Sequence, residues 1–499
     1  MGQLKLYISK CFLIILIVFS DQLISQDTLN YTLEDVITIA QEQSPDAQIA
    51  RHRYRASYWS FRTFKADYLP SLRLDATIPN LNVRFEQVSS QEDSSTVFTP
   101  LATADYQVSL SLNQKIGFSG GEVFLSSSLA RLDNNITTDL STGYLTNIVD
   151  IGIRQPIFNY NPYRYNRKIK PLLFEEAQRL YIEAKEEVAI KAVSHFFSLL
   201  MAQIEMEIAL KNEANYDTLY KIAIGRFNLG KIAENELLQL ELNLLSAEAS
   251  VENAELDYTN KLFEFNSYLQ LKEGTAVKLI PPKFTPHFTV NPDHAIEYAK
   301  ENSSSGLEFR RRILEAENEL YRAKREGRFD GQLFASFGLT QSAGTIPDAY
   351  IDPYNSERVT LGFTLPIVDW GRAKGNIKMA ESELDLVQTT IDQEKIDFDQ
   401  DVFLKVMQFN MQKKQLRIAA KSDTVAQKRF DVTQKRYKIG KVNDVLELDK
   451  AQIDNDNAKM GYYRSLMIYW QNYYEIRKLT LYDFRRNMPI TVSFDDLMN

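Results

Sequence analysis

Two halves of this chain repeat each other at an offset of roughly 210 residues. Most of the repeated length consists of long stretches with few glycines and prolines, as is typical of long helices. Three segment pairs carry the repeat: GIRQPI at 152–157 with GFTLPI at 362–367, RFNLGK at 226–231 with RYKIGK at 436–441, and DVITIA at 35–40 with HAIEYA at 294–299. The repeated unit is therefore a helix, strands, a long helix, a turn and a second long helix. Such a duplication predicts a pseudo-symmetric assembly and argues against an enzyme built around one pocket.

Each half contains a stretch with the composition of a long helix hairpin. Residues 172–280 contain no proline, and Gly225 and Gly230 lie near the middle of the stretch. After this break an apolar residue recurs every seven positions, which is the period of a coiled-coil seam. The seam comprises Leu237, Leu244, Val251, Tyr258 and Phe265, and a second apolar set beside it comprises Leu238, Leu245, Ala249, Leu256 and Phe263. Two stripes allow each helix to contact a neighbour on either side, whereas an ordinary antiparallel coiled coil, the alternative interpretation, needs one.

Between the helical stretches, apolar and polar residues alternate with the period of two that is typical of strands. The alternation covers residues 106–113, 149–154, 333–340 and 358–365. The turn sequence GFSGG at 117–121 allows four strands in the first half instead of two. A strand of a soluble sandwich alternates in the same way, but these strands are too few to form a core among so many helices. Strands from several copies of the chain that close one membrane barrel are the better interpretation.

Residues 1–26 are predicted to be an export signal. Lys5 and Lys10 precede an apolar core at 11–19 that is too short to span a bilayer. Cys11 is the only cysteine and opens this core instead of closing it, so we expect no lipoprotein anchor and no thiol chemistry in the exported protein. No later run of about 18 apolar residues is present, so we expect no transmembrane helix. A closed barrel would then be the way to span a membrane.

Composition and motifs argue against nucleic-acid binding, catalysis and cofactors. The net charge is −8, whereas a nucleic-acid partner requires a basic face. The segment 225–231 resembles a phosphate loop, but Ile232 stands where a serine or threonine is required. The four histidines lack ligand spacing, and no nucleophile, base or paired-carboxylate arrangement stands out. We therefore expect no enzyme, no cofactor and no metal site.

Taken together, these features resemble the TolC-like outer membrane efflux proteins. The resemblance covers residues 31–484 and depends on the export signal, the duplicated plan, the strand-ending Pro-Ile segments and the Gly turns between long helices. Three further segments look like family sequence: YLPSL at 68–72, LPIVDWG at 365–371 and LTLYDF at 479–484. The first half departs from the pattern at 159–163, where NYNPY replaces the Asp-Trp-Gly of the second half.

The resemblance implies a mostly α, α+β fold with a first repeat at 27–290 and a second at 291–499. Each chain of a homotrimer would give four strands to a twelve-stranded outer-membrane β-barrel, in contact with outer-membrane lipid. The long helices would form a periplasmic α-barrel, completed by short helices near 33–64 and 293–325. The implied function is a passive exit duct of a Gram-negative bacterium, in a tripartite efflux or type I secretion system. A periplasmic adaptor, and through it an inner-membrane RND or ABC transporter, would be the partners.

The resemblance also implies a periplasmic gate just after the helix turns. Asp444 and Glu447 follow Gly440 and lie one helical turn apart, so three copies would form two rings of negative charge that attract cations. Glu236 and Tyr437 fall where the family has a gate carboxylate and a gate tyrosine. The alternative interpretation is that these carboxylates are solvated groups at a helix start, stabilised by the helix dipole.

The turns themselves are the segments that the resemblance assigns to adaptor contact. The assigned residues are Phe227, Asn228, Leu229, Gly230, Ile439 and Gly440. A glycine at such a turn permits a left-handed backbone and the close approach of a partner helix. A plain helix C-cap explains each glycine equally well. A coiled-coil binding protein of the periplasm or cell surface, without a pore, is the competing function.

Overall fold

The computed structural model describes residues 29–89, 96–136, 139–272, 274–282, 288–439 and 445–497. Contacts between residues divide the chain into two compact units, and each unit draws on both halves of the sequence. The sheet unit consists of Tyr54–Gln178 and Ser304–Asp397. The hairpin unit consists of Met1–Arg53, Arg179–Ser303 and Phe398–Asn499.

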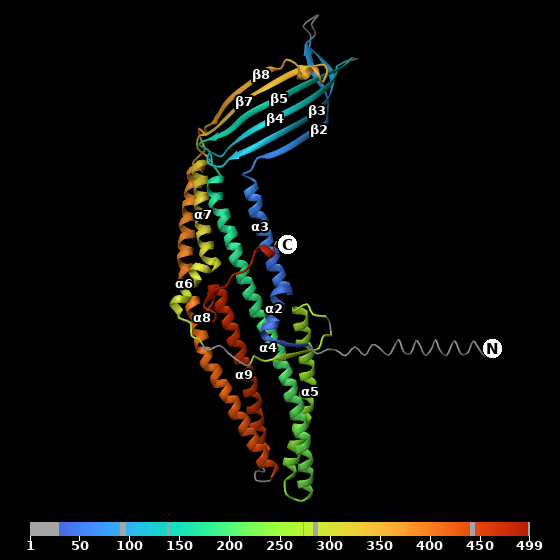
Figure 1. Cartoon of the computed structure of the whole chain (residues 1–499), viewed down its shortest axis with the longest axis vertical. Helices are drawn as coiled ribbons and strands as arrows, with labels where there is room; N and C mark the ends of the chain where they lie inside the picture. Colours follow the sequence, from blue (N-terminus) through green and yellow to red (C-terminus); the bar gives the residue numbers. More distant parts are fainter. Residues whose placement is uncertain are drawn as a thin grey trace, which may run out of the picture. The chain divides into compact units, whose positions relative to one another are not determined.

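Long helices and one large sheet dominate the chain, and three of the helices run through both units (Figure 1). The helices are α2 (Leu33–Gln43), α3 (Pro45–Ala66), α4 (Tyr163–Asn228), α5 (Glu234–Tyr268), α6 (Pro292–Asn302), α7 (Ser304–Arg325), α8 (Arg372–Lys438) and α9 (Val445–Thr480). Short 3-10 turns lie at Asp348–Tyr350 and Asp495–Leu497. The fold is thus mostly α, as the sequence predicts.

The sheet unit is built on six antiparallel strands in the order β2-β3-β4-β5-β7-β8. Their bounds are β2 Ser71–Ser89, β3 Thr96–Ile116, β4 Gly121–Ile136, β5 Asp139–Ile157, β7 Asp330–Ala343 and β8 Tyr354–Thr364. The four alternating segments of the sequence lie in β3, β5, β7 and β8. The resemblance implies four strands per chain, and that number is wrong. The first half contributes four strands because its GFSGG turn joins β3 to an additional strand, β4.

Helices of the sheet unit pack through aromatic rings and one buried ion pair. Phe61 of α3 stacks on Phe174 of α4, with ring centroids 4.7 Å apart. Arg311 of α7 makes a bidentate contact with Glu176 of α4, at 2.6 Å and 3.1 Å. Because both side chains are largely buried, the fixed fork of the guanidinium holds α4 and α7 in one register.

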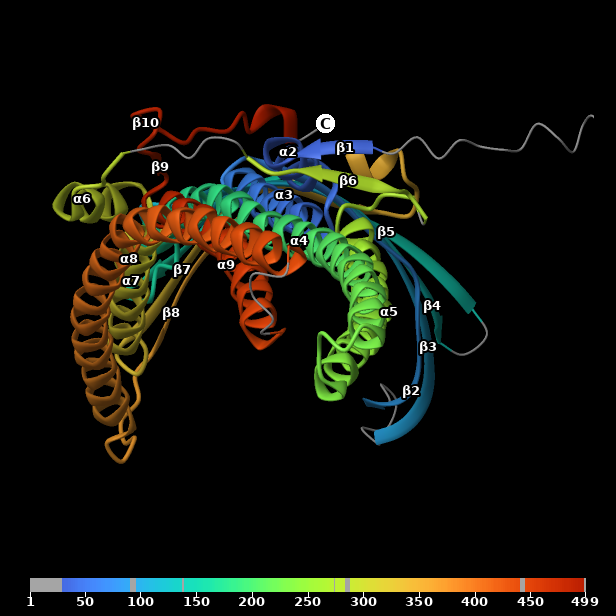
Figure 2. The same cartoon turned by 90° about the horizontal axis from the view of Figure 1, so that it is seen from below.

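The hairpin unit contains two helix hairpins and one large core. In two views α5 runs beside α4, and α9 beside α8 (Figure 1, Figure 2). The core takes residues from α2, α3, α4, α5, α6, α8 and α9 and includes Phe196, Phe265, Phe409 and Tyr469, each at most 1% exposed. Beside it, β1 (Leu29–Thr32) pairs in parallel with β6 (Val277–Ile280), and Thr32 caps α2 with a capping box.

The last segment of the chain returns to this core. Strands β9 (Tyr482–Asp483) and β10 (Met488–Pro489) form a small antiparallel pair after α9. Arg477 of α9 donates to Glu186 of α4 at 2.7 Å and 2.9 Å and to Asp483 at 2.7 Å. The Arg477 side chain is 17% exposed, and both carboxylates are at most 5% exposed. This buried cluster therefore ties the end of the chain to its first long helix.

Within the described residues, α4 is long and apolar enough to cross a membrane by length and composition. The sequence analysis expects no such helix. However, 44% of the most apolar window of α4 is buried inside the protein, and a core helix meets the same criterion. Packing inside the chain therefore accounts for part of its apolar composition.

Candidate functional site

The first hairpin turns at a helix end that requires glycine. Lys231 N donates to Arg226 O at 2.9 Å, and Gly230 N donates to Phe227 O at 2.8 Å. These two bonds form a Schellman motif, in which Gly230 takes the left-handed φ of +65°. Helix α5 then starts with Glu234 and Glu236 in its first turn, where the helix dipole favours negative charge.

The second hairpin is described on both sides of its turn. Helix α8 ends at Lys438, Ile439 follows it, and α9 starts at Val445. Gly440 and Asp444, which the resemblance assigns to the tip and the gate, lie outside the described residues. The described part of the predicted gate is therefore Glu236, Tyr437 and Glu447.

Near the turns, all four hairpin helices share a small apolar cluster, which we call the tip cluster. Its buried members are Leu219, Ala223, Leu240, Phe430, Tyr437, Val445, Leu448 and Ala451. The four helices that contribute are α4, α5, α8 and α9. The two hairpins are thus joined to each other at their tips.

An arginine and a tyrosine connect the hairpins within this cluster. Arg226 of α4 donates to the carbonyl oxygens of Tyr437 and Lys438, at 3.2 Å and 3.3 Å. Its guanidinium also lies 5.3 Å from the centre of the Tyr437 ring, within cation–π range. Tyr437 is 1% exposed, and burial raises the pKa of its hydroxyl, with Glu236 and Asp449 adding to the shift and Arg226 opposing it. Arg226 thus binds the end of α8 from the opposite hairpin.

A polar ladder continues from the tip cluster along the same helices. Asp449 of α9 accepts hydrogen bonds from Tyr216 of α4 at 3.1 Å and from Asn243 of α5 at 2.7 Å. Further along, Asn212 donates to Asp456 at 2.8 Å, and Gln452 donates to Asn212 at 2.8 Å. Burial, followed by the charge of Asp449, raises the pKa of Tyr216 well above its usual value. Polar pairs therefore supplement a small apolar contact area at this end of the hairpins.

The structure brings Glu236 and Tyr437 to the same end of the hairpin unit, and one Glu236 oxygen, Oε2, is buried without a hydrogen-bond partner. Glu447 is half-buried, two residues before Asp449. Sequence reasoning misses Arg226, Tyr216, Asn243 and Asp449. A signal for Arg226 was present, because it begins the repeated RFNLGK segment and matches Arg436 in the second half.

The tip residues assigned to a partner include exposed apolar side chains. Leu229 is 75% exposed, Ile439 is 65% exposed and Phe227 is 38% exposed. Asn228 is also exposed. An apolar surface at the turns is therefore available for contact with another protein.

Two further apolar stripes of the hairpin unit have no partner among the described residues. One runs along α5 and comprises Leu242, Ala249, Leu256 and Phe263. The other runs along α8 and continues to the residue after it, and it comprises Leu404, Met411, Ile418, Val425, Val432 and Ile439. Both stripes have the seven-residue period of a coiled-coil seam and are exposed. We call them the α5 seam and the α8 seam. The heptad that the sequence predicts at Leu237, Leu244 and Phe265 instead packs partly or fully inside the chain.

The six-stranded sheet of the sheet unit has an apolar face and a polar face. In one row, Leu72, Leu112, Leu125, Ile151 and Phe337 are paired across β2, β3, β4, β5 and β7, and they are 37% to 67% exposed. The adjacent row has Arg73, Ser111, Ser126, Asp150, Gly338 and Ser356, which point to the opposite face. Among the described residues, the outer edges of β2 and β8 pair with no strand. The sheet is therefore open on both sides.

No group of three or more metal-ligating side chains occurs in the part of the chain that the structure describes. The hairpin tips and the two-faced sheet thus constitute the candidate functional elements.

Comparisons with known proteins agree with this architecture. A family model described as outer membrane efflux protein matches residues 314–465. The outer membrane channel CmeC of Campylobacter jejuni has a similar structure, with a TM-score of 0.65 and 14% identity over 93% of this chain and 88% of that one. A membrane protein of Pseudomonas aeruginosa gives 0.64 and 13% over 90% of both chains. The outer membrane protein VceC of Vibrio cholerae gives 0.62 and 12% over 90% and 95%. The comparison with curated proteins gave no match.

Proposed function

We propose that this chain, which carries an outer membrane efflux protein domain and has the fold of TolC-like outer-membrane channels, is the passive exit duct of a multicomponent export system. The family-model match over residues 314–465 and the similar channel structures support a location in the outer membrane, with the helices in the periplasm. Substrate would enter through the hairpin tips and leave through the barrel. An inner-membrane RND or ABC transporter would supply the energy, so the chain itself needs no catalytic site.

The observation that carries the proposal is the open, two-faced sheet. An apolar row suits contact with lipid, and a polar row suits a water-filled lumen. A membrane-spanning sheet cannot leave the N–H and C=O groups of its edges unpaired in hydrocarbon. The edges of β2 and β8 must therefore pair with other strands, and further copies of this chain supply them.

The α5 and α8 seams of the hairpin unit are a second argument, independent of the sheet, that copies of this chain contact one another. A lone chain exposes heptad stripes on α5 and α8, and such stripes stabilise a protein only when a facing helix covers them. The α5 seam of one copy against the α8 seam of the next would cover both. A ring of three copies, as in the TolC-like proteins, would close the helical tunnel and bring together six strands from each chain.

Three copies with six strands each would close an eighteen-stranded barrel, in contrast to the twelve strands that the resemblance implies. Barrels of 16–18 strands leave an open aqueous channel. The expected pore in the membrane is therefore wider than that of a twelve-stranded duct. The narrowest point of the path would then lie at the hairpin tips.

Reconstitution in planar bilayers tests the duct directly. Purified full-length protein should form trimers and conduct ions in discrete steps, with a conductance that large polyethylene glycols reduce only above the size limit of the pore. The competing function, a coiled-coil binding protein without a pore, predicts soluble monomers or dimers and no conductance. That result would overturn the proposal.

Charge in the α8 seam tests the assembly. The double variant Ile418→Glu and Val425→Glu should remain folded, because both side chains are more than half exposed in the single chain, but should fail to form trimers. Lys421→Glu is the matched control, since Lys421 lies on the same helix and is exposed outside the seam. Trimers that persist in the double variant, as measured by light scattering, would contradict this arrangement.

We further propose that the hairpin tips form a gate, in which carboxylates of three subunits make rings of negative charge around the pore. Asp444 and Glu447 would surround the pore axis, and Glu236 and Tyr437 would line the closed tip together with Arg226. The buried Glu236 oxygen without a partner supports this role, because such an atom is stabilised by a cation or by a neighbouring subunit. Asp444→Ala combined with Glu447→Ala should weaken block of the channel by divalent cations. Unchanged block would rule out the rings.

The exposed turns are the proposed docking site for the periplasmic adaptor. Phe227, Asn228, Leu229 and Gly230 would meet it on the first hairpin, and Ile439 and Gly440 on the second. Leu229→Asp and Ile439→Asp should abolish adaptor binding and export while leaving single-channel conductance unchanged. Loss of conductance in the same variants would indicate a damaged pore instead of a lost docking surface.

A further inference from the structure

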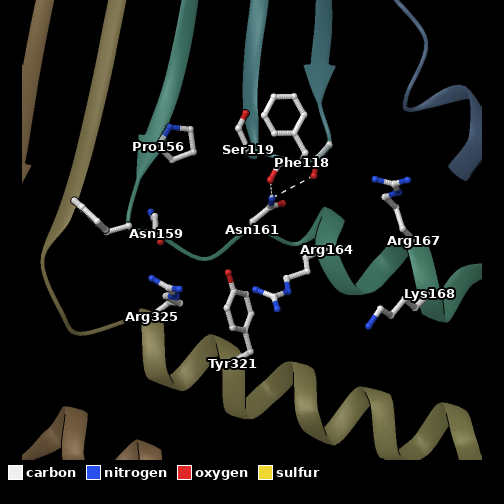
Figure 3. A pocket seen from close by; sticks show the side chains of 12 residues that line it. Phe118, Ser119, Pro156, Asn159, Asn161, Arg164, Arg167, Lys168, Tyr321 and Arg325 are labelled. Atoms are coloured by element: carbon white, nitrogen blue, oxygen red, sulfur yellow. Dashed lines mark hydrogen bonds between the residues drawn. The ribbon is translucent and has the colours of Figure 1, made fainter.

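A basic cavity of about 570 Å³ lies in the sheet unit where strands meet helices (Figure 3). It is bordered by the turn at 117–120 between β3 and β4 and by the end of β5. The start of α4 and the last turn of α7 complete it. All of these segments belong to the sheet unit.

Four cationic side chains line the cavity: Arg164, Arg167, Lys168 and Arg325. Among the lining residues that the structure describes, none is an aspartate or a glutamate. Within the described residues none of the four makes an ion pair, although other arginines of α7 do. Arg311 pairs with Glu176, and Arg312 pairs with Glu394 at 2.5 Å. The cavity therefore concentrates positive charge that the chain itself leaves unbalanced.

One aromatic ring, that of Tyr321, positions two of these cations. The guanidinium carbons of Arg164 and Arg325 lie 5.1 Å and 5.5 Å from the centre of the same Tyr321 ring. The Tyr321 hydroxyl lies between the two side chains in Figure 3. Two guanidinium groups and one hydroxyl can donate hydrogen bonds to the same anion, and stacked guanidinium groups lose little freedom when they do so.

Hydrogen bonds fix the wall that faces these groups. Asn161 Nδ2 donates to Gly117 O and Phe118 O, both at 3.2 Å (Figure 3). Asn161 Oδ1 accepts from Tyr163 N at 3.0 Å. One side chain thus joins the β3–β4 turn to the start of α4. Gly120 has a φ of +78°, and a Cβ at this position would approach Asn161 to 3.1 Å, so the turn requires glycine. The cavity is therefore shaped before any ligand enters.

Two phenylalanines line the cavity beside this charge. Phe118 is 85% exposed and Phe158 is 64% exposed, and both occur where the strands end. Aromatic side chains in such positions mark the boundary between hydrocarbon and headgroups in membrane proteins. The same cavity thus combines apolar rings suited to an acyl chain with cations suited to a phosphate.

We infer that this cavity binds the phosphate of an anionic phospholipid headgroup in the periplasmic leaflet of the outer membrane. The inference rests on the proposed function only for the membrane location of the strands. Arg164, Arg325 and the Tyr321 hydroxyl would hold a phosphate, and Arg167 and Lys168 lie close enough to the same cavity to hold a second. Four positive charges therefore favour a lipid with two phosphate groups, such as cardiolipin, over one with a single phosphate group.

Binding of fluorescent lipids to the purified full-length protein in detergent tests the inference. Cardiolipin should bind about tenfold more tightly than phosphatidylglycerol, and phosphatidylcholine should not saturate. The double variant Arg164→Gln and Arg325→Gln should bind cardiolipin about 30-fold more weakly, the effect of two lost headgroup contacts. Lys324→Gln with Lys374→Gln removes the same charge outside the cavity and should bind like the wild type.

Inorganic phosphate distinguishes the two sources of the anion. Millimolar phosphate should fail to displace cardiolipin, because it lacks the acyl chains that contact Phe118 and Phe158. Displacement at micromolar concentration would overturn the lipid assignment, and so would equal lipid binding by the two double variants. Single-channel conductance of the Arg164→Gln and Arg325→Gln variant should match the wild type. A failed lipid site is thereby distinguished from a failed duct, which would not conduct in any variant.

Discussion

The two ends of the helix hairpins are held together by different means, although both belong to the hairpin unit. The body of the hairpin unit has a large core, to which seven of the described helices contribute, and the buried Arg477 cluster. The described part of the tip has eight buried apolar residues, a cation–π contact and a ladder of polar pairs. Separating helices that bury a large apolar area requires much free energy, whereas separating a small cluster supported by hydrogen bonds requires less. Opening should therefore require less free energy at the tip than in the body.

The largest expected difference comes from truncating matched tyrosines, one in each region. Tyr469 in the body and Tyr437 at the tip are both 1% exposed. Tyr469→Ala should lower the free energy of unfolding by about 3–5 kcal/mol, the range for removing a buried aromatic ring. Tyr437→Ala should leave the melting temperature of the body nearly unchanged but raise hydrogen exchange at the ends of α4 and α8. Equal losses of melting temperature in the two variants would contradict two separate regions.

The second-largest loss of stability is expected when the buried ion cluster around Arg477 is broken. Arg477→Met leaves Glu186 and Asp483 buried without their cation and should lower the free energy of unfolding by about 3 kcal/mol. Lys478→Met is the neighbouring control, because its pair with Glu187 is more than one-third exposed and should contribute less than about 1 kcal/mol. Urea unfolding followed by circular dichroism measures both. Similar midpoints for the two variants would show that Arg477 is not a structural tie.

A smaller effect is expected from removing one hydrogen bond of the polar ladder next to the tip cluster. Tyr216→Phe removes the donor to Asp449, which keeps its bond from Asn243, and should cost about 1 kcal/mol of tip stability. Tyr220→Phe is the control, since Tyr220 packs against the tip cluster without a hydrogen bond in the described structure. The channel proposed above should open more often in Tyr216→Phe and not in Tyr220→Phe.

The smallest expected effects are those of pH, which should act in opposite directions on the two regions. Burial raises the pKa of Tyr216 and of Tyr437, so the tip is stable below the ordinary tyrosine pKa near 10 and weakens as pH rises above it. Burial lowers the pKa of His195, which stacks on Tyr268 in the body. The body is therefore stable above the ordinary histidine pKa near 6.5 and weakens as pH falls below it.

Hydrogen-exchange mass spectrometry of tip and body peptides can separate these directions, after correction for the intrinsic pH dependence of exchange. Tyr216→Phe should reduce the alkaline response of the tip, and His195→Gln the acid response of the body. A shared response of both regions to either extreme would indicate that they open as one unit.

Much of this architecture can be predicted from the sequence, because the periodic spacing of apolar residues matches the helices and strands of the structure. The heptads at Leu237 and Leu244 predict α5, and the alternations at 333–340 and 358–365 predict β7 and β8. The number of strands is harder to predict. In β2 a bulge between Thr77 and Asn80 shifts the register and interrupts the alternation of apolar and polar residues. After such a bulge the apolar residues change parity, and a period-two pattern is no longer visible.

The candidate site is less predictable than the fold for a related reason. The glycine turns place Glu236 and Tyr437 near the tips by local sequence alone. The contact of Arg226 with the end of α8 joins residues 211 and 212 positions apart, so it depends on how two hairpins pack. Periodicity identifies the buried face of each helix, but it does not identify the helix that lies against it.

The Arg477 cluster also has a consequence for biogenesis. Glu186 is 291 positions before Arg477, and Asp483 follows later still. During vectorial secretion the early carboxylate emerges long before its cation, so this cluster can close only after residues 477–483 have emerged. A prematurely terminated product would retain a buried, uncompensated glutamate and remain a substrate for proteolysis. Closure of this cluster would therefore mark chains that have been synthesised at least through Asp483.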